Sequence, residues 1–228
     1  MIAISSILAA RSLNKTVYGE FEGIASQNGI TVQSVIDDAA STAQIFQDYM
    51  VTQYDNYAKN GYSGVTQKSE VYDVNLQEMN KEIEDFILSV ARSKVQSNEE
   101  FAGIGVFFEP DAFDPAIKDY TIYVSESDAA NGTVHSYGAY ESYGSQEYYK
   151  NVATTQDNCF TDPYEDQGVK MVSASFPIVY DGKTQGVILV DINLNTFSQL
   201  RSTDSKYPSM YVDVLSDDST IIYDSESM

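Results

Sequence analysis

The chain has 228 residues, with 13 Lys and Arg against 34 Asp and Glu, so its formal net charge at pH 7 is −21. Hydrophobic residues make up 43% of the sequence and charged residues 21%, which is typical of a folded protein rather than a disordered acidic segment or a membrane bundle. The length suffices for one large domain, or for one domain and part of a second. Because a surface of this charge repels phosphate backbones, we exclude nucleic acid as a partner.

Few side chains are available for metal binding or nucleophilic catalysis. The chain has one cysteine, Cys159, and one histidine, His135, too few for an intramolecular disulfide, a His/Cys zinc cluster or a Cys-His catalytic system. Asp111 and Asp114 flank a phenylalanine, but two carboxylates are weak evidence for calcium. We therefore expect no catalytic residue, no metal and no cofactor. Scarce cysteine fits a reduced cytoplasm and an extracytoplasmic bacterial protein equally well.

The start of the chain is apolar. Met1 to Ala10 are apolar or small, and Arg11 and Lys15 follow. This stretch is too short for a hydrocarbon core that needs about 20 residues, and it lacks the charged start of a signal peptide. On these residues alone, the outer end of a membrane helix and an ordinary helix start are equally good interpretations.

Helices are predicted in the first part of the chain. Apolar residues recur at steps of three and four over residues 31–58, without Pro or Gly, and we assign a long helix to residues 13–60, with Asn28-Gly29 as its weak point. The Gly-rich stretch that follows ends this helix. A second helix is predicted over residues 69–94, so that two helices precede any strand.

After Glu99 the periodicity changes to short apolar runs that predict strands. Asp181-Gly182 between two of these runs predicts a tight hairpin turn, and short helices are predicted over residues 145–155 and 193–200. Helices followed by hairpin-linked strands indicate an α+β fold rather than an alternating βαβ fold. The predicted strands cover residues 103–108, 120–124, 133–140, 171–179, 185–192, 211–215 and 220–223.

The last two predicted strands flank a turn at Ser216–Ser219 and would form a hairpin that nothing covers. A two-stranded hairpin is marginally stable alone. We therefore expect residues 201–228 to begin a second, smaller module, and the complete protein to continue beyond Met228.

Four segments form an ordered pattern. They are FFEPDAFD at residues 107–114, Glu147-Tyr148-Tyr149, TDPYED at residues 161–166, and a hairpin that runs from SFPI at residues 175–178 to DINL at residues 191–194. In order and spacing this pattern resembles the extracytoplasmic double Cache sensor domains of bacterial chemoreceptors, histidine kinases and cyclic-dinucleotide enzymes. The resemblance extends through most of the chain.

The resemblance implies a PAS-like antiparallel sheet on a long N-terminal helix that emerges from a membrane. It favours residues 1–12 as the end of a transmembrane helix and residues 13–60 as a long signalling helix. It further implies a membrane-distal PAS-like ligand-binding module at residues 61–200 and the beginning of a membrane-proximal module at residues 201–228.

The resemblance also implies ligand-facing positions, which are those of the amino-acid-binding members. Gln146 stands where these members have an arginine, and an arginine is the usual partner of a ligand α-carboxylate. We therefore expect an ordinary free amino acid to be a poorer ligand than another amine or a nucleobase. The positions are Tyr148, Tyr149, Gln146, Tyr164, Asp166 and Asp191.

The residue types in this set favour a cationic ligand. The carboxylates of Asp166 and Asp191 would be satisfied by a primary ammonium with its three donors, and a tyrosine face attracts a cation by about 0.5 to 2 kcal/mol. Simpler interpretations stay open at this stage. Asp191 is also a suitable N-cap for the next helix, Asp166 is also a suitable turn residue, and tyrosines are often packing residues.

We expect an extracellular small-molecule sensing domain of a transmembrane receptor, either a methyl-accepting chemotaxis protein or, as the alternative, a histidine kinase or diguanylate cyclase. A carbohydrate-active enzyme that uses Asp166 and Asp191 as an acid-base pair and a surface adhesin are the alternatives of another class. The expected partners are an amine, amino-acid derivative or nucleobase, the membrane through flanking helices, and a second copy of the chain through residues 32–54 in the full-length receptor. The expected location is the cell membrane, with this domain outside the cytoplasm.

Overall fold

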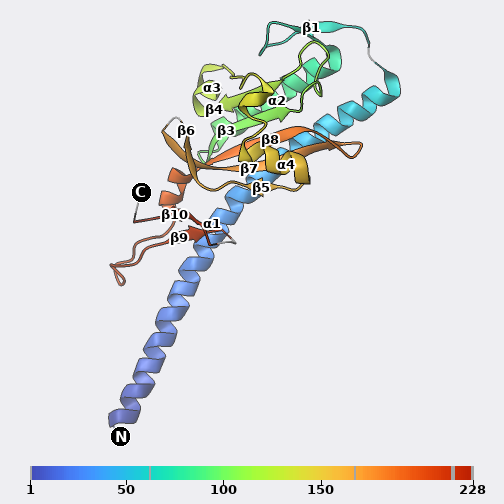
Figure 1. Cartoon of the computed structure of the whole chain (residues 1–228). Helices are drawn as coiled ribbons and strands as arrows, with labels where there is room; N and C mark the ends of the chain where they lie inside the picture. Colours follow the sequence, from blue (N-terminus) through green and yellow to red (C-terminus); the bar gives the residue numbers. More distant parts are fainter. Residues whose placement is uncertain (1, 62, 167, 217–218, 227–228) are drawn as a thin grey trace.

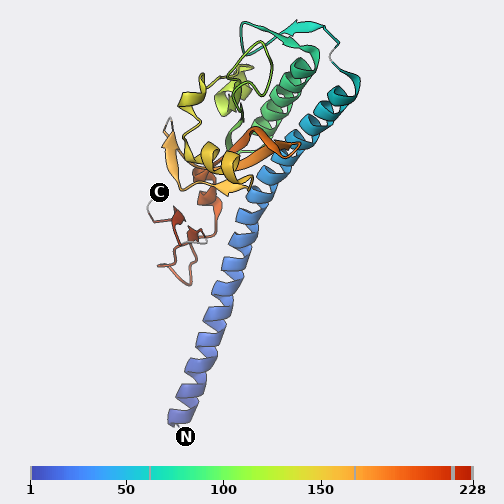
Figure 2. The ribbon, with the colours of Figure 1, turned by 45° about the vertical axis from the view of Figure 1, so that its right-hand side comes forward.

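The chain is described here in a computed structural model that covers residues 2–61, 63–166, 168–216 and 219–226, with the backbone alone for residues 2–13. One helix, α1 (Ile2–Asn60), forms the axis of the molecule, and its N-terminal part extends away from all other elements (Figures 1 and 2). It ends as predicted, at Gly61 with φ +72°. In the described residues, no helix has a stretch that is both long and apolar enough to cross a bilayer.

Asn28-Gly29 does not interrupt α1, although a glycine inside a helix costs about 1 kcal/mol relative to alanine. The buried Asn28 side chain accepts a hydrogen bond from Arg201 N at 2.9 Å and donates to Arg201 O at 3.2 Å. A contact between residues far apart in the sequence thus supports the position that local propensity makes weak.

The second helix, α2 (Glu78–Ser97), begins later than residue 69, where the sequence pattern places it. The short strands β1 (Thr66–Lys68) and β2 (Asn75–Gln77) lie between the two long helices, so the prediction that both helices precede any strand is wrong. The Ser69 hydroxyl accepts hydrogen bonds from the backbone N–H groups of Val71 and Tyr72 and donates to Glu84. These bonds hold residues 69–72 in a tight loop. Val71 and Val74 pack against the core from this loop, and their spacing imitates a helical period.

One antiparallel sheet follows, and it confirms the α+β class (Figure 1). Its strand order is β4-β3-β8-β7-β5, and β6 also pairs with β7. The β7–β8 hairpin turns at Asp181 and Gly182, both with positive φ, as the type I′ turn signal predicts. The strands are β3 (Phe101–Phe108), β4 (Thr121–Ser125), β5 (Cys159–Phe160), β6 (Tyr164–Asp166), β7 (Val169–Tyr180) and β8 (Lys183–Asn193).

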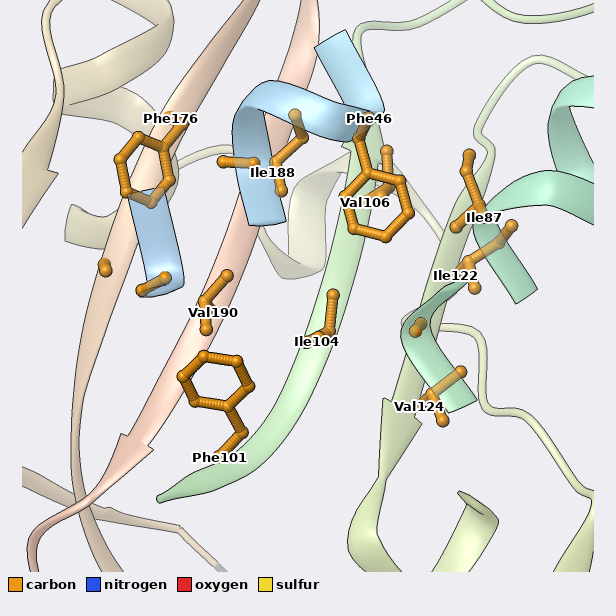
Figure 3. Close-up of a cluster of buried hydrophobic side chains, with 14 of the residues drawn as sticks. Phe46, Ile87, Phe101, Ile104, Val106, Ile122, Val124, Phe176, Ile188 and Val190 are labelled. Atoms are coloured by element: carbon orange, nitrogen blue, oxygen red, sulfur yellow. The ribbon is translucent and has the colours of Figure 1, made fainter. Parts of the chain in front are cut away.

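The main core lies between this sheet and the two long helices. Alternate residues of each strand point to the helices, such as Val106 on β3 and Ile188 on β8, and they meet Phe46 of α1 and Ile87 of α2 (Figure 3). This alternation leaves the other side chains of the same strands on the opposite face of the sheet. That face is covered by α4 and the loop before it, and it holds the candidate site.

The segment that covers the second face departs from the sequence prediction. Residues 133–140 are not a strand, because His135 alone pairs with Tyr123 and Gly138 has a φ of +73°. Tyrosine rings that pack on the sheet produce the alternating pattern there. The helices of this layer and of its surroundings are α3 (Glu126–Asn131), the 3₁₀ turn η1 (Tyr140–Ser142), α4 (Glu147–Thr155) and the 3₁₀ turn η2 (Leu194–Gln199).

The last described elements are β9 (Asp213–Leu215) and β10 (Ile221–Asp224), which form the predicted antiparallel hairpin. The predicted turn includes residues 217 and 218, which lie outside the described residues. The expectation that nothing covers this hairpin is wrong, because Tyr223 is buried and its ring lies edge-on to Phe197 of η2, with the centroids 6.0 Å apart.

Candidate functional site

The candidate site begins at the pair of residues where β7 and β8 face each other with polar side chains. Ser173 lies opposite Asp191 in the register, and both side chains point away from the main core. Their neighbours Val172 and Ile192 point into that core. Asp191 is only 3% exposed, so the strand alternation places a carboxylate inside the protein.

Three hydroxyl groups surround the Asp191 carboxylate. Tyr123 Oη donates to Oδ2 at 2.6 Å, Ser173 Oγ donates to Oδ1 at 2.6 Å, and Tyr164 Oη lies 3.4 Å from Oδ1. Burial raises the pKa of Asp191 to about 6, against the opposite effect of these hydrogen bonds. The carboxylate therefore has hydrogen-bond donors but gains no positive charge from them.

Two glycines of β3 make room for the Tyr123 ring. A Cβ at Gly103 would lie 2.2 Å from Tyr123 Oη, and a Cβ at Gly105 would lie 3.0 Å from the same ring. The GIGVFF strand therefore needs these glycines so that a tyrosine on β4 can reach across β3 to Asp191 on β8.

Two further tyrosines lie near this carboxylate. The pKa of Tyr148 is raised to about 12, mainly by burial and further by the charges of Asp191 and Asp166. The same causes raise the pKa of Tyr137. The Tyr137 ring is edge-on to Tyr123, with the centroids 5.4 Å apart. Asp166 is exposed on β6, so it lies at the edge of the cluster. We call these side chains the Asp191 cluster: Tyr123, Tyr137, Tyr148, Tyr164, Asp166, Ser173 and Asp191.

The structure brings together four of the six residues that the resemblance implies, namely Tyr148, Tyr164, Asp166 and Asp191. Tyr149 is fully buried elsewhere, and its hydroxyl donates to Glu109 Oε1 at 2.7 Å.

Gln146 is exposed at the start of α4, where its Nε2 lies 3.5 Å from Ser142 O. Asp191 does not cap the next helix, because the N-cap of η2 is Asn193, whose side chain accepts from Asn195 N at 3.0 Å. Asp166 lies in a strand rather than in a turn.

Tyr123, Tyr137 and Ser173 also belong to the cluster and were not predicted from the sequence. The signal for Ser173 is present in VSASF, where serines alternate with residues of a buried strand. Ser175 lies on the same face, and its hydroxyl is buried without a hydrogen-bond partner in the described structure. The tyrosines give no such signal, because a ring's direction depends on packing.

The described residues contain no group of three or more His, Cys, Asp or Glu side chains that could hold a metal ion. Asp114, which the sequence offered as a weak calcium ligand, is buried and accepts hydrogen bonds from Gln77 N and Asn80 Nδ2, both at 2.8 Å. Its role in the structure is to connect the loop after β3 to the start of α2.

The segment that contains the Asp191 cluster matches a known protein family. Residues 87–199 match the family model for the first PDC sensor domain of methyl-accepting chemotaxis protein-like proteins. This part of the chain is a PDC (Cache) sensor domain. The PDC segment contains the whole Asp191 cluster, so the cluster belongs to a sensor domain. Comparison with curated proteins gives no match.

Solved structures of sensor domains share the fold of the PDC segment and its long helix. The extracellular domain of soHK1S-Z6, which is classed as a histidine kinase, is similar with a TM-score of 0.65 and 18% identity over 94% of this chain and 72% of that one. The periplasmic sensory domain of the Campylobacter jejuni chemoreceptor Tlp1 has a TM-score of 0.54 and 8% identity over 89% of this chain and 70% of that one. At these identities the similarity establishes the fold alone.

Proposed function

We propose that the chain is the extracytoplasmic ligand-binding domain of a transmembrane receptor, of the chemotaxis-receptor type or, as the alternative, of the histidine kinase or diguanylate cyclase type. We further propose that the Asp191 cluster binds an amine-bearing or nucleobase-like metabolite. The observation that carries this proposal is a buried carboxylate, Asp191, that is surrounded by tyrosines in a PDC domain.

The chemistry of the cluster supports a cation or an N–H donor as ligand. A carboxylate has about four acceptor positions, and three hydroxyls use part of this capacity at Asp191. A buried charge without a counter-charge is costly, and a cationic ligand would offset this cost at Asp191. The faces of Tyr148 and Tyr137 would add cation–π attraction of about 0.5 to 2 kcal/mol per ring.

The same cluster gives little support to a ligand α-carboxylate. Asp166 and Asp191 both carry negative charge, and Gln146 at the start of α4 is a neutral amide that is exposed. An arginine would have supplied two parallel hydrogen bonds to a carboxylate. The proposal therefore favours amines and nucleobases over free amino acids.

Binding, rather than catalysis, also fits the position of Asp191. A glycosidase needs two carboxyl groups that reach one glycosidic bond in an open cleft, whereas Asp191 is 3% exposed beneath the layer of α4 and the loop before it. A ligand reaches Asp191 only if this layer moves. Closure over the ligand would favour one of two arrangements of α1 against a second copy of the chain, in proportion to the difference in ligand affinity between them.

The proposal is tested by thermal denaturation with a library of amines, nucleobases and amino acids at pH 7.5. A sensor shows saturable stabilisation by one of them without consuming it. Asp166→Asn should reduce the affinity for a cationic hit to a smaller degree than loss of a buried partner would, because Asp166 is an exposed charge at the edge of the cluster. Asp162→Asn is the matched control, because it is an exposed aspartate in the same segment. Turnover of the hit would support an enzyme, and equal loss in both variants would contradict the assigned site.

A further inference from the structure

An apolar cavity lies on the opposite face of the sheet from the Asp191 cluster. Its volume is about 310 Å³, and it lies, open to solvent on one side, where α1, the β7–β8 strand pair, η2 and the β9–β10 hairpin meet. Val172, Ile192 and Phe197 form its inner wall and are at most 5% exposed. Phe160 and Leu215, which are 45% and 55% exposed, also line the cavity and lie at its opening.

The polar groups of the cavity wall already have partners. Its described lining contains no charged residue, and its side-chain hydroxyls belong to Thr161 and Ser216. Thr161 Oγ1 accepts from Ser173 N at 3.0 Å, and Ser216 Oγ bonds both N and O of Thr220. An ordered water needs two to four polar partners, so the apolar inner wall of this cavity gives an ordered water few hydrogen bonds.

The size of the cavity sets the size of its occupant. An apolar cavity of about 150 Å³ in another protein stays dry and binds benzene, and about 310 Å³ is roughly twice that volume. We propose that this cavity is a second binding site, distinct from the Asp191 cluster, for an uncharged apolar molecule of the size of a one- or two-ring aromatic compound. Charged molecules are excluded, because no charged group of the described lining compensates a buried charge.

The position of this site connects it to both parts of the molecule. Val172 and Ile192 precede and follow Ser173 and Asp191 directly in the sequence, so the two sites lie back to back on one strand pair. Val214 of β9 and Ile36 of α1 line the cavity from the other side. An occupant therefore joins the hairpin to the helix and the sheet, and it stabilises the folded protein by mass action.

The test uses indole as the neutral probe and benzoate as a charged compound of similar size, with the methyl groups of isoleucine and valine followed by NMR. Indole should shift the methyl resonances of Ile36, Val172 and Ile192 in a saturable manner and leave those of Ile83 and Ile87, in the core at α2, unchanged. Benzoate should shift neither set. Absence of a saturable shift up to the solubility limit of indole would overturn the proposal, and so would equal shifts with benzoate.

Variants separate the cavity from other sites. Ile36→Phe fills the cavity and should weaken indole binding at least tenfold, whereas Ile45→Phe is the same change on an exposed part of α1 and should have no effect. Val214→Phe serves as a second filling variant if Ile36→Phe lowers stability.

Without indole, the resonances of the cavity methyl groups should not depend on protein concentration. A dependence would show that a second copy of the chain occupies the cavity, and it would overturn the proposal. Asp191→Asn should keep indole binding, so failure of the cation site and failure of the cavity site are distinguishable.

Discussion

Replacement of Asp191 by asparagine should make the protein more stable at neutral pH while it abolishes binding of a cationic ligand. Asparagine is nearly isosteric with the protonated carboxyl group, and the surrounding hydroxyls of Tyr123 and Ser173 can each donate or accept a hydrogen bond. The variant thus removes the buried charge and keeps the polar contacts. A residue whose loss stabilises the fold but removes binding is retained for function.

The magnitude follows from the pKa of Asp191, which is about 6 in the folded protein against an ordinary value of 3.8. At about 1.4 kcal/mol per pKa unit, the ionised side chain destabilises the folded state by about 3 kcal/mol above pH 6. The folded protein binds more protons than the unfolded chain between pH 4 and pH 6, so this cost appears as the pH rises through that window. At pH 4 the variant and the native protein should be nearly equally stable, and at pH 7 the variant should be more stable by up to about 3 kcal/mol.

The assay is urea denaturation of both proteins between pH 4 and pH 7.5. The difference in unfolding free energy between them isolates Asp191 from the other acidic groups, which titrate in both proteins. A difference that stays constant over this pH range would refute the assigned burial of charge. A variant that is less stable at pH 7 would show that the hydroxyl contacts of the carboxylate outweigh its desolvation.

The remaining predictions concern other parts of the fold. Affinity for a cationic ligand should fall about tenfold per pH unit below pH 6, because binding requires the ionised Asp191; calorimetry between pH 7.5 and pH 5 checks this, and a flat profile would contradict it. Gly103→Ala should displace the Tyr123 hydroxyl, which lies 2.2 Å from the added Cβ, and weaken the ligand at least tenfold, whereas Gly23→Ala, with no atom within 4 Å of its added Cβ, should not change the affinity. Asp128→Asn removes half of the capping box of α3 and should cost about 1 kcal/mol. Hydrogen bonds to Ser125, Thr133 and His135 overcome burial and lower the pKa of Asp128 to about 2, so its stabilisation is present above pH 4 and is lost towards pH 2, which acid titration of both proteins measures. Sedimentation velocity should show a monomer at low salt and weak dimerisation as ionic strength rises, because 21 net negative charges per chain repel across about 8 Å at physiological salt; a tight dimer at low salt would contradict this.

Much of the secondary structure was predictable from local sequence. The long helix, the strands β3, β4, β7 and β8, and the turn at Asp181-Gly182 all follow from periodicity and turn chemistry, which act between residues close in the chain. The errors occur where apolar residues pack from loops. Val71 and Val74 imitate a helix, and residues 133–140 imitate a strand, because burial alone does not distinguish a packed loop from a regular element.

The acidic members of the Asp191 cluster were also predictable, because Asp166 ends the segment TDPYED and Asp191 begins the segment DINL of the Cache pattern. By itself the sequence determined which residue types reach this sheet face, through the alternation of Ser173 and Ser175 with apolar residues on β7. It also determined that glycines occupy β3 at Gly103 and Gly105. These are properties of single strands, and they need no knowledge of the neighbours.

The tertiary structure alone decided which tyrosines face Asp191. Tyr148 and Tyr149 are adjacent on α4 and point about 100° apart around the helix axis, so either one could have faced the sheet from its sequence alone. The way α4 lies on β7 and β8 places Tyr148 near Asp191 and Tyr149 at Glu109. The direction of each ring depends on how one element packs against another, and that packing is not encoded in any single segment.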